Sequence, residues 1–407
     1  MRPYAKLYVN RKGEKAARSG HPWVYGEEVT HCDGAYKTGD IVDVLSEKGR
    51  YLGTGFANDI SKIRVRIIST NANDTFDEAF WKRRVHYALA YRQTVMGSQD
   101  FSCCRLIFGD ADQLPGLTVD LYKNIVVAQT LCYGMDQVKP VILKAIVEEL
   151  GELGISLRGI YERNDVGVRK LDGLEEYKGW FKGDFLPEPD GVITTIVENG
   201  ITYEVDVENG QKTGFFLDQK YNRLAVAKLA RGKHVLDCFT HTGAFALNAA
   251  AGGAASVTAV DVSEEAVRMT EENIRRNGYT GTVQALQANV FDLLTELAEK
   301  KCHDYDFIIL DPPAFTKSGH TVNNAVRGYK EINLKAMRLL PRGGYLATCS
   351  CSHFMREDLF RHMLHDAAAD AGVQLRQIEA RQQAPDHPIL WNVPETNYLK
   401  FYLFQVI

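Results

Sequence analysis

The 407-residue sequence lacks several features that would place it in a special class of protein. It contains no run of eighteen apolar residues, which excludes an ordinary membrane-spanning helix. Residues 1–20 alternate apolar and charged side chains and predict neither a signal peptide nor a membrane anchor. None of the eight cysteines forms a Cys-x-x-Cys pair, so no metal is expected. Their scatter along the chain indicates the reduced thiols of a cytoplasmic protein rather than a disulfide framework.

The composition also lacks a charge bias. The 48 Lys and Arg residues face 52 Asp and Glu, which gives a net charge of −4. A hydrophobic content of 45% and a charged content of 25% are typical of a soluble globular protein, and the length predicts two or three domains. Because affinity for nucleic acid depends on cations placed near phosphates, RNA binding would need a local basic surface.

The first 74 residues are predicted to form a small β-barrel or sandwich. Short segments of β-type composition occur between turns at residues 40–44, 51–56 and 63–68. Cations gather in this part of the chain, and the candidate RNA contacts are Arg11, Lys12, Arg64 and Arg66. Arg64 and Arg66 are two residues apart, so they would share one face of a strand. A solvated strand face without an RNA partner is the alternative.

Residues 75–190 are predicted to form a central α+β domain. Thr75 and Glu78 have capping-box spacing, and the apolar residues after them recur at helical intervals. A second amphipathic helix is expected from Val138 to Leu150, ending at Gly151. Strand-like segments are found at residues 117–121, 125–131 and 159–161, and further ones follow this domain at 193–197 and 201–207.

The third predicted domain, residues 191–407, alternates strands and helices from about residue 220. Strands are expected at residues 235–238, 257–261, 283–286, 307–311, 345–350, 375–379 and 398–406, with helices between the first six. This alternation predicts an α/β fold with a doubly wound, mostly parallel sheet. Ligands of such sheets bind beyond the carboxyl ends of the strands.

Acidic residues end the first two of these strands, and the G-x-G-x-x-G fingerprint of dinucleotide binding is missing. Asp237 leads into a loop with one glycine, Gly243, which suits a ligand with an ammonium group and no phosphate. S-adenosylmethionine is such a ligand, and Asp237 would attract its methionyl amine. Asp261 is placed to accept hydrogen bonds from ribose hydroxyls, unless the acids here serve a helix capped by Ser263. The expected cofactor contacts are Asp237, Phe239, Gly243, Asp261 and, for the adenine amino group, Asn289.

Asp311 ends the fourth strand and is followed by Pro312, Pro313 and, two residues later, Phe315. The prolines remove backbone donors and fix a rigid turn. The Asp311 carboxylate can then accept N–H groups from a planar substrate on which Phe315 stacks. A flipped-out nucleobase meets these demands, whereas the alternative is a turn with an incidental acid.

Cys349 and Cys351 lie on one face of the fifth strand. Cys351 is nearer the carboxyl end and hence the cofactor, and Cys349 is expected in the core. Carbon 5 of a pyrimidine is too weak a nucleophile to attack a sulfonium directly. Addition of the Cys351 thiolate at carbon 6 would activate carbon 5, with Asp311 stabilising the ring, and loss of the carbon-5 proton would release the enzyme. Both cytosine and uracil fit this chemistry.

Nearly the whole chain resembles the bacterial large-subunit rRNA cytosine-C5 methyltransferase family. The segments that carry the resemblance are residues 20–25, 39–42, 111–117, 211–219, 311–315, 327–330, 350–352 and 386–388. The resemblance implies an N-terminal PUA RNA-binding domain, a central α+β domain and a Rossmann-like class I methyltransferase domain. It implies that Cys351 is the nucleophile and that residues 211–218 close over S-adenosylmethionine. The contacts implied are Lys212, Thr213, Phe216 and Asp218 for the cofactor, and Pro312, Pro313, Phe315, Tyr329 and His387 for the rRNA substrate.

The sequence departs from the family at two positions. Asn289 stands where relatives often have Asp, and Cys349 where an apolar residue is common. No cysteine lies beside Asp-Pro-Pro, so the second thiol of two-cysteine RNA cytosine methyltransferases is not evident. Candidates for the base that removes the carbon-5 proton are His241, His353 and His387, and each of them also suits a structural role.

Two other functions fit part of the pattern. An N-methyltransferase acting on a purine would use Asp-Pro-Pro and the aromatic residue but would not need Cys351. A non-catalytic RNA-binding protein would bind no cofactor, although the acids at the strand ends argue against it. The sequence leaves the oligomeric state open, with a homodimer as one option.

Overall fold

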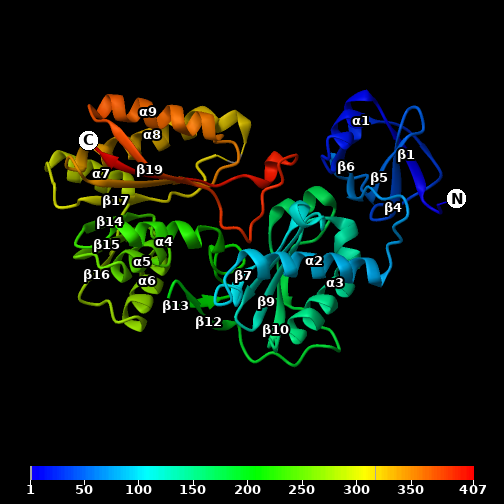
Figure 1. The fold of residues 1–407 in the computed structure, drawn as a ribbon, viewed down its shortest axis with the longest axis horizontal. Helices are drawn as coiled ribbons and strands as arrows, with labels where there is room; N and C mark the ends of the chain where they lie inside the picture. Colours follow the sequence, from blue (N-terminus) through cyan, green and yellow to red (C-terminus); the bar gives the residue numbers. More distant parts are fainter. Residues whose placement is uncertain (1, 317) are drawn as a thin grey trace. The chain divides into compact units, whose positions relative to one another are not determined.

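The computed structural model describes residues 2–316 and 318–407 (Figure 1). Its contacts divide the chain into two compact units. The first unit extends to Ile196 and includes Glu204–Leu217 and Pro385–Thr396, and the second consists of Val197–Tyr203, Asp218–Ala384 and Asn397–Ile407. The chain therefore passes between the units several times, and the domain boundaries expected at residues 74 and 190 stay predictions.

The N-terminal part of the first unit is a six-stranded sheet around a small apolar core, as the β-type segments predict. The strand order is β2-β6-β5-β4-β1-β3. The bounds are β1 Ala5–Val9, β2 Trp23–Tyr25, β3 Val29–Asp33, β4 Ile41–Ser46, β5 Tyr51–Ala57 and β6 Ile63–Ser69. The strands bury residues such as Leu7, Val24, Val44 and Val65 against one another.

The sequence analysis missed one helix in this part, α1 (Arg11–Arg18). Only the small residues Gly13 and Ala17 of this helix are buried, so no large apolar side chains reveal it in the sequence. Its start is fixed by Asn10, whose side chain accepts a hydrogen bond from the Gly13 backbone N–H at 3.0 Å.

The rest of the first unit contains a five-stranded sheet of order β11-β10-β9-β8-β7 with two long helices, α2 (Glu78–Val95) and α3 (Tyr133–Glu152). The strand bounds are β7 Cys103–Phe108, β8 Leu117–Tyr122, β9 Ile125–Thr130, β10 Gly159–Asn164 and β11 Tyr177–Trp180. The predicted capping box was wrong, because Asp77 rather than Thr75 caps α2 and accepts from Phe80 N at 3.0 Å. Helix α3 begins five residues before the predicted start and contains Pro140. A two-stranded sheet, β12 (Ile193–Glu198) and β13 (Ile201–Asp206), follows.

The second unit is built on the doubly wound sheet that the sequence predicts. Seven strands lie in the order β16-β15-β14-β17-β18-β20-β19, all parallel except β20. Their bounds are β14 His234–Cys238, β15 Ser256–Asp261, β16 Val283–Gln287, β17 Phe307–Leu310, β18 Tyr345–Ser350, β19 Leu375–Arg381 and β20 Lys400–Val406. Each lies within two residues of its predicted position at both ends, which confirms the predicted fold class.

Helices cover both faces of this sheet. Figure 1 shows α4 (Lys220–Leu229), α5 (Ala244–Ala251) and α6 (Glu264–Arg276) on one side. On the other side lie α7 (Val290–Glu299), α8 (Val322–Leu339) and α9 (Glu357–Ala371), which pack on residues such as Leu236, Ile308 and Leu346. Among the described residues, no helix combines the length and the apolar character needed to cross a membrane.

A buried ion pair ties the start of the second unit to α4. The guanidinium of Arg223 donates two hydrogen bonds to the carboxylate of Glu198, at 2.6 and 2.9 Å, and both side chains are almost fully buried. Removing one partner of such a pair leaves the other charge in an apolar surrounding.

We expect Glu198→Ala to lower the free energy of unfolding by about 3–5 kcal/mol, because it strands the Arg223 charge. The matched control is Glu296→Ala, which breaks an exposed i,i+4 pair with Lys300 and should cost less than about 1 kcal/mol. Urea unfolding followed by circular dichroism measures both. Equal losses for the two variants would contradict the role given to the buried pair.

Candidate active site

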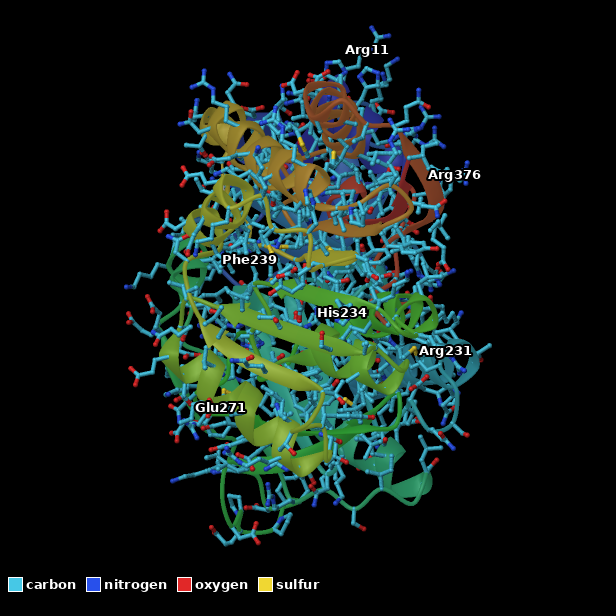
Figure 2. All side chains as sticks on the ribbon, turned by 90° about the vertical axis from the view of Figure 1, so that its left-hand side faces the viewer. Arg11, Arg231, His234, Phe239, Glu271 and Arg376 are labelled. Atoms are coloured by element: carbon cyan, nitrogen blue, oxygen red, sulfur yellow. The ribbon has the colours of Figure 1, made fainter. Side chains whose placement is uncertain are left out.

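The sequence-predicted residues Asp237, Asp261, Asp311 and Cys351 all come to one edge of the large sheet. They lie at or directly after the carboxyl ends of β14, β15, β17 and β18, four strands that are neighbours in the order β15-β14-β17-β18. Because these strands are parallel, their carboxyl ends meet at the same edge. Figure 2 labels His234 at the start of β14 and Phe239 directly after its end.

Asp237 is fully buried and anchors the loop that follows β14. Its Oδ2 accepts hydrogen bonds from Thr240 Oγ1 at 2.5 Å and from the Ala246 backbone N–H at 2.9 Å. Its Oδ1 is buried without a hydrogen-bond partner among the described residues. Burial, together with the nearby charges of Asp311 and Asp261, raises the pKa of Asp237 to about 7. A ligand ammonium would offset both the buried charge and the unpaired oxygen.

The loop after β14 has a strained backbone held by several hydrogen bonds. Phe239 and His241 have φ angles of 65° and 53°, in the left-handed region that side chains other than glycine rarely adopt. His241 N–H donates to Asp261 Oδ2 at 3.0 Å, and its carbonyl accepts from Thr270 Oγ1 at 2.9 Å. Gly243, with φ of 80°, begins α5, and a Cβ at this position would lie 2.8 Å from Thr270 Cγ2. A glycine is therefore required here.

Asp261 and Asn289 accept hydrogen bonds from backbone N–H groups near the starts of α6 and α7, and their expected ligand contacts stay predictions. The second oxygen of Asp261 accepts from Ser263 N–H at 3.0 Å, and Ser263 itself caps α6. The Asn289 side-chain oxygen accepts from Phe291 N–H at 2.9 Å and caps α7. A carboxylate offers about four acceptor sites. The capping bonds thus orient these side chains and leave acceptor capacity for a ligand.

Asp311 is held by donors from two other elements. Gln219 Nε2 donates to its Oδ1 at 2.9 Å, and the Cys349 thiol donates to the same carboxylate. Burial and the charge of Asp218 raise the pKa of Asp311 to about 6, while the hydrogen bonds from Cys349 and Gln219 oppose that shift. Asp218 accepts a hydrogen bond from Tyr398 Oη at 2.6 Å. Gln219 ends the 211–219 segment, but no pattern in the sequence marks it as the partner of Asp311.

Phe315 belongs to an aromatic cluster beside the Asp-Pro-Pro turn. Its ring centroid lies 4.5 Å from that of Tyr329, 5.8 Å from Phe291 and 6.4 Å from Phe239. Tyr329 is fully buried, and its hydroxyl accepts from Ser350 Oγ at 3.1 Å. Tyr329 therefore packs against Phe315 from the buried side. Phe315 itself is only partly buried. Of the two prolines, Pro312 is buried and Pro313 is exposed.

Cys349 in β18 and Cys351 just after it differ in burial, as the sequence predicts. Cys349 is fully buried, and burial raises the pKa of its thiol well above the ordinary value. Cys349 is thus a hydrogen-bond donor rather than a nucleophile. Cys351 follows the last residue of the strand and is partly exposed. A residue that the sequence analysis missed, Lys400 of β20, pairs in register with Ser350 of this strand. No pattern in the sequence marks Lys400, because a lysine at the start of a strand is common.

Several other predicted residues lie in the first unit. Lys212 places its ammonium 4.4 Å from the ring centroid of Phe216, and Thr213 Oγ1 donates to Asp120 Oδ2 at 2.5 Å. His387 is 2% exposed, and its Nδ1 lies 2.8 Å from Asp386 Oδ1. Of the two other histidines considered as bases, both in the second unit, His241 contributes its backbone to the loop after β14 and His353 is exposed.

The candidate RNA-contacting cations differ in how they are paired. Arg11 is exposed at the first position of α1 (Figure 2), and Lys12 forms an exposed ion pair with Glu27 at 2.7 Å. Arg64 pairs with Asp59, while Arg66 lies 3.3 Å from Asp172 and 5.8 Å from the ring centroid of Trp23. A cavity of about 250 Å³ near the end of α1 is lined by side chains that include those of His21, Ile67, Asp110, Gln113 and Asn392.

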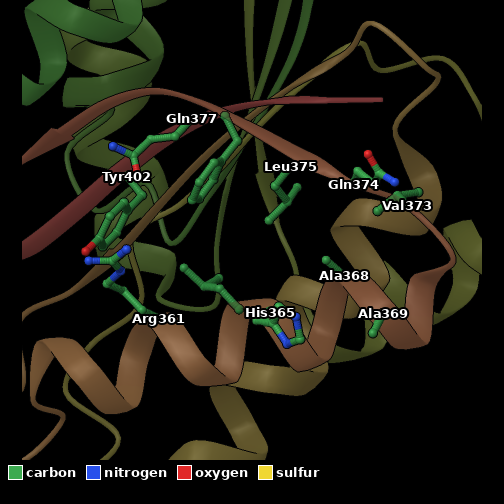
Figure 3. Close-up of a pocket in the computed structure, with 11 residues that line it drawn as sticks. Arg361, His365, Ala368, Ala369, Val373, Gln374, Leu375, Gln377 and Tyr402 are labelled. Atoms are coloured by element: carbon green, nitrogen blue, oxygen red, sulfur yellow. The ribbon is translucent and has the colours of Figure 1, made fainter.

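A larger cavity of about 380 Å³ lies elsewhere in the second unit (Figure 3). It is formed by α9 with β19 and β20, and its lining includes Arg361, His365, Leu375 and Tyr402. None of the predicted site residues lines it. The larger of the two cavities is therefore separate from the candidate site residues at the carboxyl ends of the strands.

Two family models match the chain. Residues 171–405 match the model described as S-adenosylmethionine-dependent methyltransferase, and residues 7–70 match that of a PUA-like domain. Similar proteins are named ribosomal RNA large subunit methyltransferase I. Those of Alteromonas mediterranea and Pseudoalteromonas atlantica are 39% and 40% identical to this chain, with 97% of each sequence covered.

Solved structures share the fold. A SAM-dependent methyltransferase from Streptococcus mutans superposes with a TM-score of 0.81 at 22% identity, covering 98% of this chain and 99% of that one. SMU.776, described as a methyltransferase complexed with SAH, gives a TM-score of 0.83 at the same identity and coverage. At this identity the likeness concerns the fold alone.

The raised pKa of Asp237 predicts a pH dependence of stability. A carboxyl group with a folded-state pKa of about 7 binds its proton more tightly in the folded than in the unfolded state. Its contribution to stability is therefore present below about pH 4 and is lost as the pH rises to about 7.

We expect Asp237→Asn to reduce this loss, because the amide oxygen can still accept from Thr240 and Ala246 and carries no charge. The measurement is the difference in free energy of unfolding between variant and wild type, from urea unfolding at pH 5 and pH 8. The variant should gain stability relative to wild type at pH 8 by more than about 1 kcal/mol. A difference independent of pH would contradict the buried, protonated state.

Proposed function

Since the chain belongs to the S-adenosylmethionine-dependent methyltransferase family and carries a PUA-like domain, we propose that it methylates carbon 5 of a cytosine in large-subunit ribosomal RNA. The observation that carries the proposal is the placement of Cys351 beside Asp311 at the carboxyl ends of neighbouring strands. The choice of rRNA rests on the printed names of relatives that are similar over 97% of the chain.

S-adenosylmethionine supplies a methyl group on a sulfonium, which reacts with an electron-rich carbon or nitrogen. The residues proposed to hold it are Asp237 for the ammonium, Asp261 for the ribose hydroxyls and Asn289 for the adenine. Gly243 lets the backbone pass close by, and Phe239 contributes a wall of the site. The buried, unpaired Oδ1 of Asp237 supports this assignment, because it matches a cationic donor. Asp218, with Lys212, Thr213 and Phe216 of the 211–218 segment, completes the proposed set.

The substrate base is proposed to lie between Asp311 and Phe315. The Asp311 carboxylate would accept N–H groups at the polar edge of the ring, and Phe315 would stack on its face. Pro312 and Pro313 fix the turn that joins the two residues. Tyr329 acts through Phe315, which it supports, and His387 remains a proposed substrate contact.

Cys351 is proposed as the nucleophile. Its sulfur adds to carbon 6 of the base, and the electron pair of the 5,6 double bond makes carbon 5 nucleophilic. After carbon 5 gains the methyl group, its proton leaves and the carbon–sulfur bond breaks, which restores the ring and the thiolate. The partly exposed Cys351 suits this role, while the buried Cys349 does not.

We expect Cys351→Ala to lower methyl transfer from labelled S-adenosylmethionine to unmodified rRNA by at least a thousandfold, because the activated carbon 5 no longer forms. The control is Cys302→Ala, a thiol of similar partial exposure on another part of the second unit, which should keep the activity. Calorimetry with S-adenosylhomocysteine should give the same affinity for all three proteins.

Full activity of Cys351→Ala would instead favour transfer to an exocyclic amine of a purine, which Asp311 and the aromatic residue also suit. Failure of the wild-type protein to bind S-adenosylhomocysteine would favour the non-catalytic alternative. Mapping of methylated positions in rRNA from cells with and without the protein then identifies the nucleotide.

The PUA-like domain is proposed to bind RNA phosphates through its exposed cations. Arg11 gives the sharpest test, because its exposed side chain forms no hydrogen bond or ion pair with another described residue. We expect Arg11→Ala to weaken RNA binding and to reduce the slope of log affinity against log salt by about 0.7–0.9. Arg231→Ala, an exposed cation of the second unit, is the control and should leave the slope unchanged. Identical slopes for wild type and Arg11→Ala would exclude this contact.

A further inference from the structure

A buried lysine lies on the strand next to the proposed nucleophile. Lys400 is the first residue of β20 and is only 6% exposed. It is the antiparallel partner of Ser350, the residue that precedes Cys351. Its ammonium donates to the Ser352 carbonyl oxygen at 2.7 Å and to the Tyr398 carbonyl oxygen at 2.8 Å. One of these two acceptors thus belongs to the residue that follows Cys351.

One N–H group of the Lys400 ammonium is not used by these hydrogen bonds. An ammonium carries three N–H groups, and two of them are used by the carbonyl oxygens. The Lys400 ammonium forms no other hydrogen bond with the described residues. The charge of Lys400 interacts with Cys351 and with Glu357, so the thiol lies within the field of the buried cation. Two neutral carbonyls do not balance a buried charge, whereas a thiolate does.

Other described ionisable groups also act near Cys351. Cys349 lies two residues away on β18 and donates to the Asp311 carboxylate, and Tyr329 of α8 interacts electrostatically with Cys351. Glu357, at the start of α9, interacts with Lys400 and accepts a hydrogen bond from Tyr402 Oη at 2.8 Å. None of these three groups is a cation, whereas the ammonium of Lys400 favours the ionised form of the sulfur.

We propose that Lys400 is the positioning residue that keeps Cys351 as a thiolate, both through its ammonium charge and by fixing the Ser352 carbonyl beside the nucleophile. This inference rests on the proposed cytosine-C5 reaction. The Cys351 proton leaves to solvent before substrate arrives, and the ammonium keeps its own proton throughout. The thiolate then forms the bond to carbon 6, and the same ion pair is restored when that bond breaks.

Burial lowers the pKa of Lys400 to about 8, and the charges of Cys351 and Glu357 act in the opposite direction. The ammonium is therefore still largely protonated at neutral pH. Above about pH 8 the lysine loses its charge, and the support that it gives to the thiolate is lost with it.

The test measures the thiol itself, in the full-length protein without RNA or cofactor. Iodoacetamide alkylates thiolates, and peptide mass spectrometry gives the rate at Cys351 from pH 5 to pH 10. The same digest gives the rate at Cys302, a partly exposed cysteine on another part of the unit that serves as an internal control. Lys400→Gln removes the charge but keeps amide N–H groups for the two carbonyl oxygens. Lys400→Arg keeps the charge.

We expect Lys400→Gln to lower the alkylation rate of Cys351 at pH 7 by about tenfold relative to Cys302, and to move the midpoint of its pH profile upward by about one unit. Lys400→Arg should stay within about threefold of wild type. Methyl transfer by Lys400→Gln should then recover as the pH is raised, with a change in kcat rather than in KM.

An unchanged Cys351 profile in Lys400→Gln would overturn the proposal. If that variant does not fold, Lys400→Arg decides, since a profile shifted by a full unit although the charge is kept would equally overturn it. The outcome is separate from the fate of the proposed function. If Lys400→Gln shifts the pH profile of Cys351 but Cys351→Ala is fully active, the ion pair is supported and the cytosine-C5 reaction is contradicted.

Discussion

The burial of acidic side chains at the carboxyl ends of neighbouring parallel strands is the constraint on which the rest of the second unit depends. Asp237 is the penultimate residue of β14, and Asp311 directly follows β17. Burial raises the pKa of both carboxyl groups, and a neighbouring carboxylate adds to the shift, Asp311 for Asp237 and Asp218 for Asp311. Such a pair persists only where donors are fixed around it. Thr240, Ala246, Gln219 and Cys349 supply these donors, and they come from the loop after β14, α5, the segment before α4 and β18. In the proposed function, these acids select a ligand with an ammonium group and a substrate with N–H groups.

The same constraint explains why the fold of this unit could be predicted well. Strands buried on both faces read as short apolar runs, and acids mark where three of them end. The first unit was harder. Helix α1 is nearly all polar, so its existence depends on the cap at Asn10 and on packing of Ala17, neither of which produces periodicity. The start of α2 was misplaced for a related reason, because Asp77 and Thr75 are both suitable caps by residue type and only backbone geometry chooses between them.

The candidate site was predictable where function follows from position along a strand, and not where it follows from a partner distant in sequence. Cys351, Asp311 and Asp237 could be proposed from the sequence because each lies at or directly after the end of a strand, and the structure places them there. Gln219 lies 92 residues from Asp311, and Lys400 lies 48 residues from the Ser352 carbonyl that it holds. Neither partner has a signature of its own, since a glutamine before a helix and a lysine at a strand start are both common. Antiparallel pairing of β20 with β18 brings Lys400 to Ser350, and that pairing is a property of the whole sheet.

Cys349 and Cys351 show how much the exposure of a thiol changes at the end of one strand. They share a face and are separated by one residue, yet Cys349 is enclosed by the sheet and donates to Asp311, while Cys351 lies just beyond the last strand residue and is partly exposed. A thiol inside the sheet has an apolar surrounding that holds its proton, and it serves the acid as a donor. A thiol past the strand end meets the cation of β20 instead. The end of the strand thus separates two kinds of thiol. Cys349 keeps its proton and donates it in a hydrogen bond to the Asp311 carboxylate, whereas the proposed reaction requires Cys351 to lose its proton.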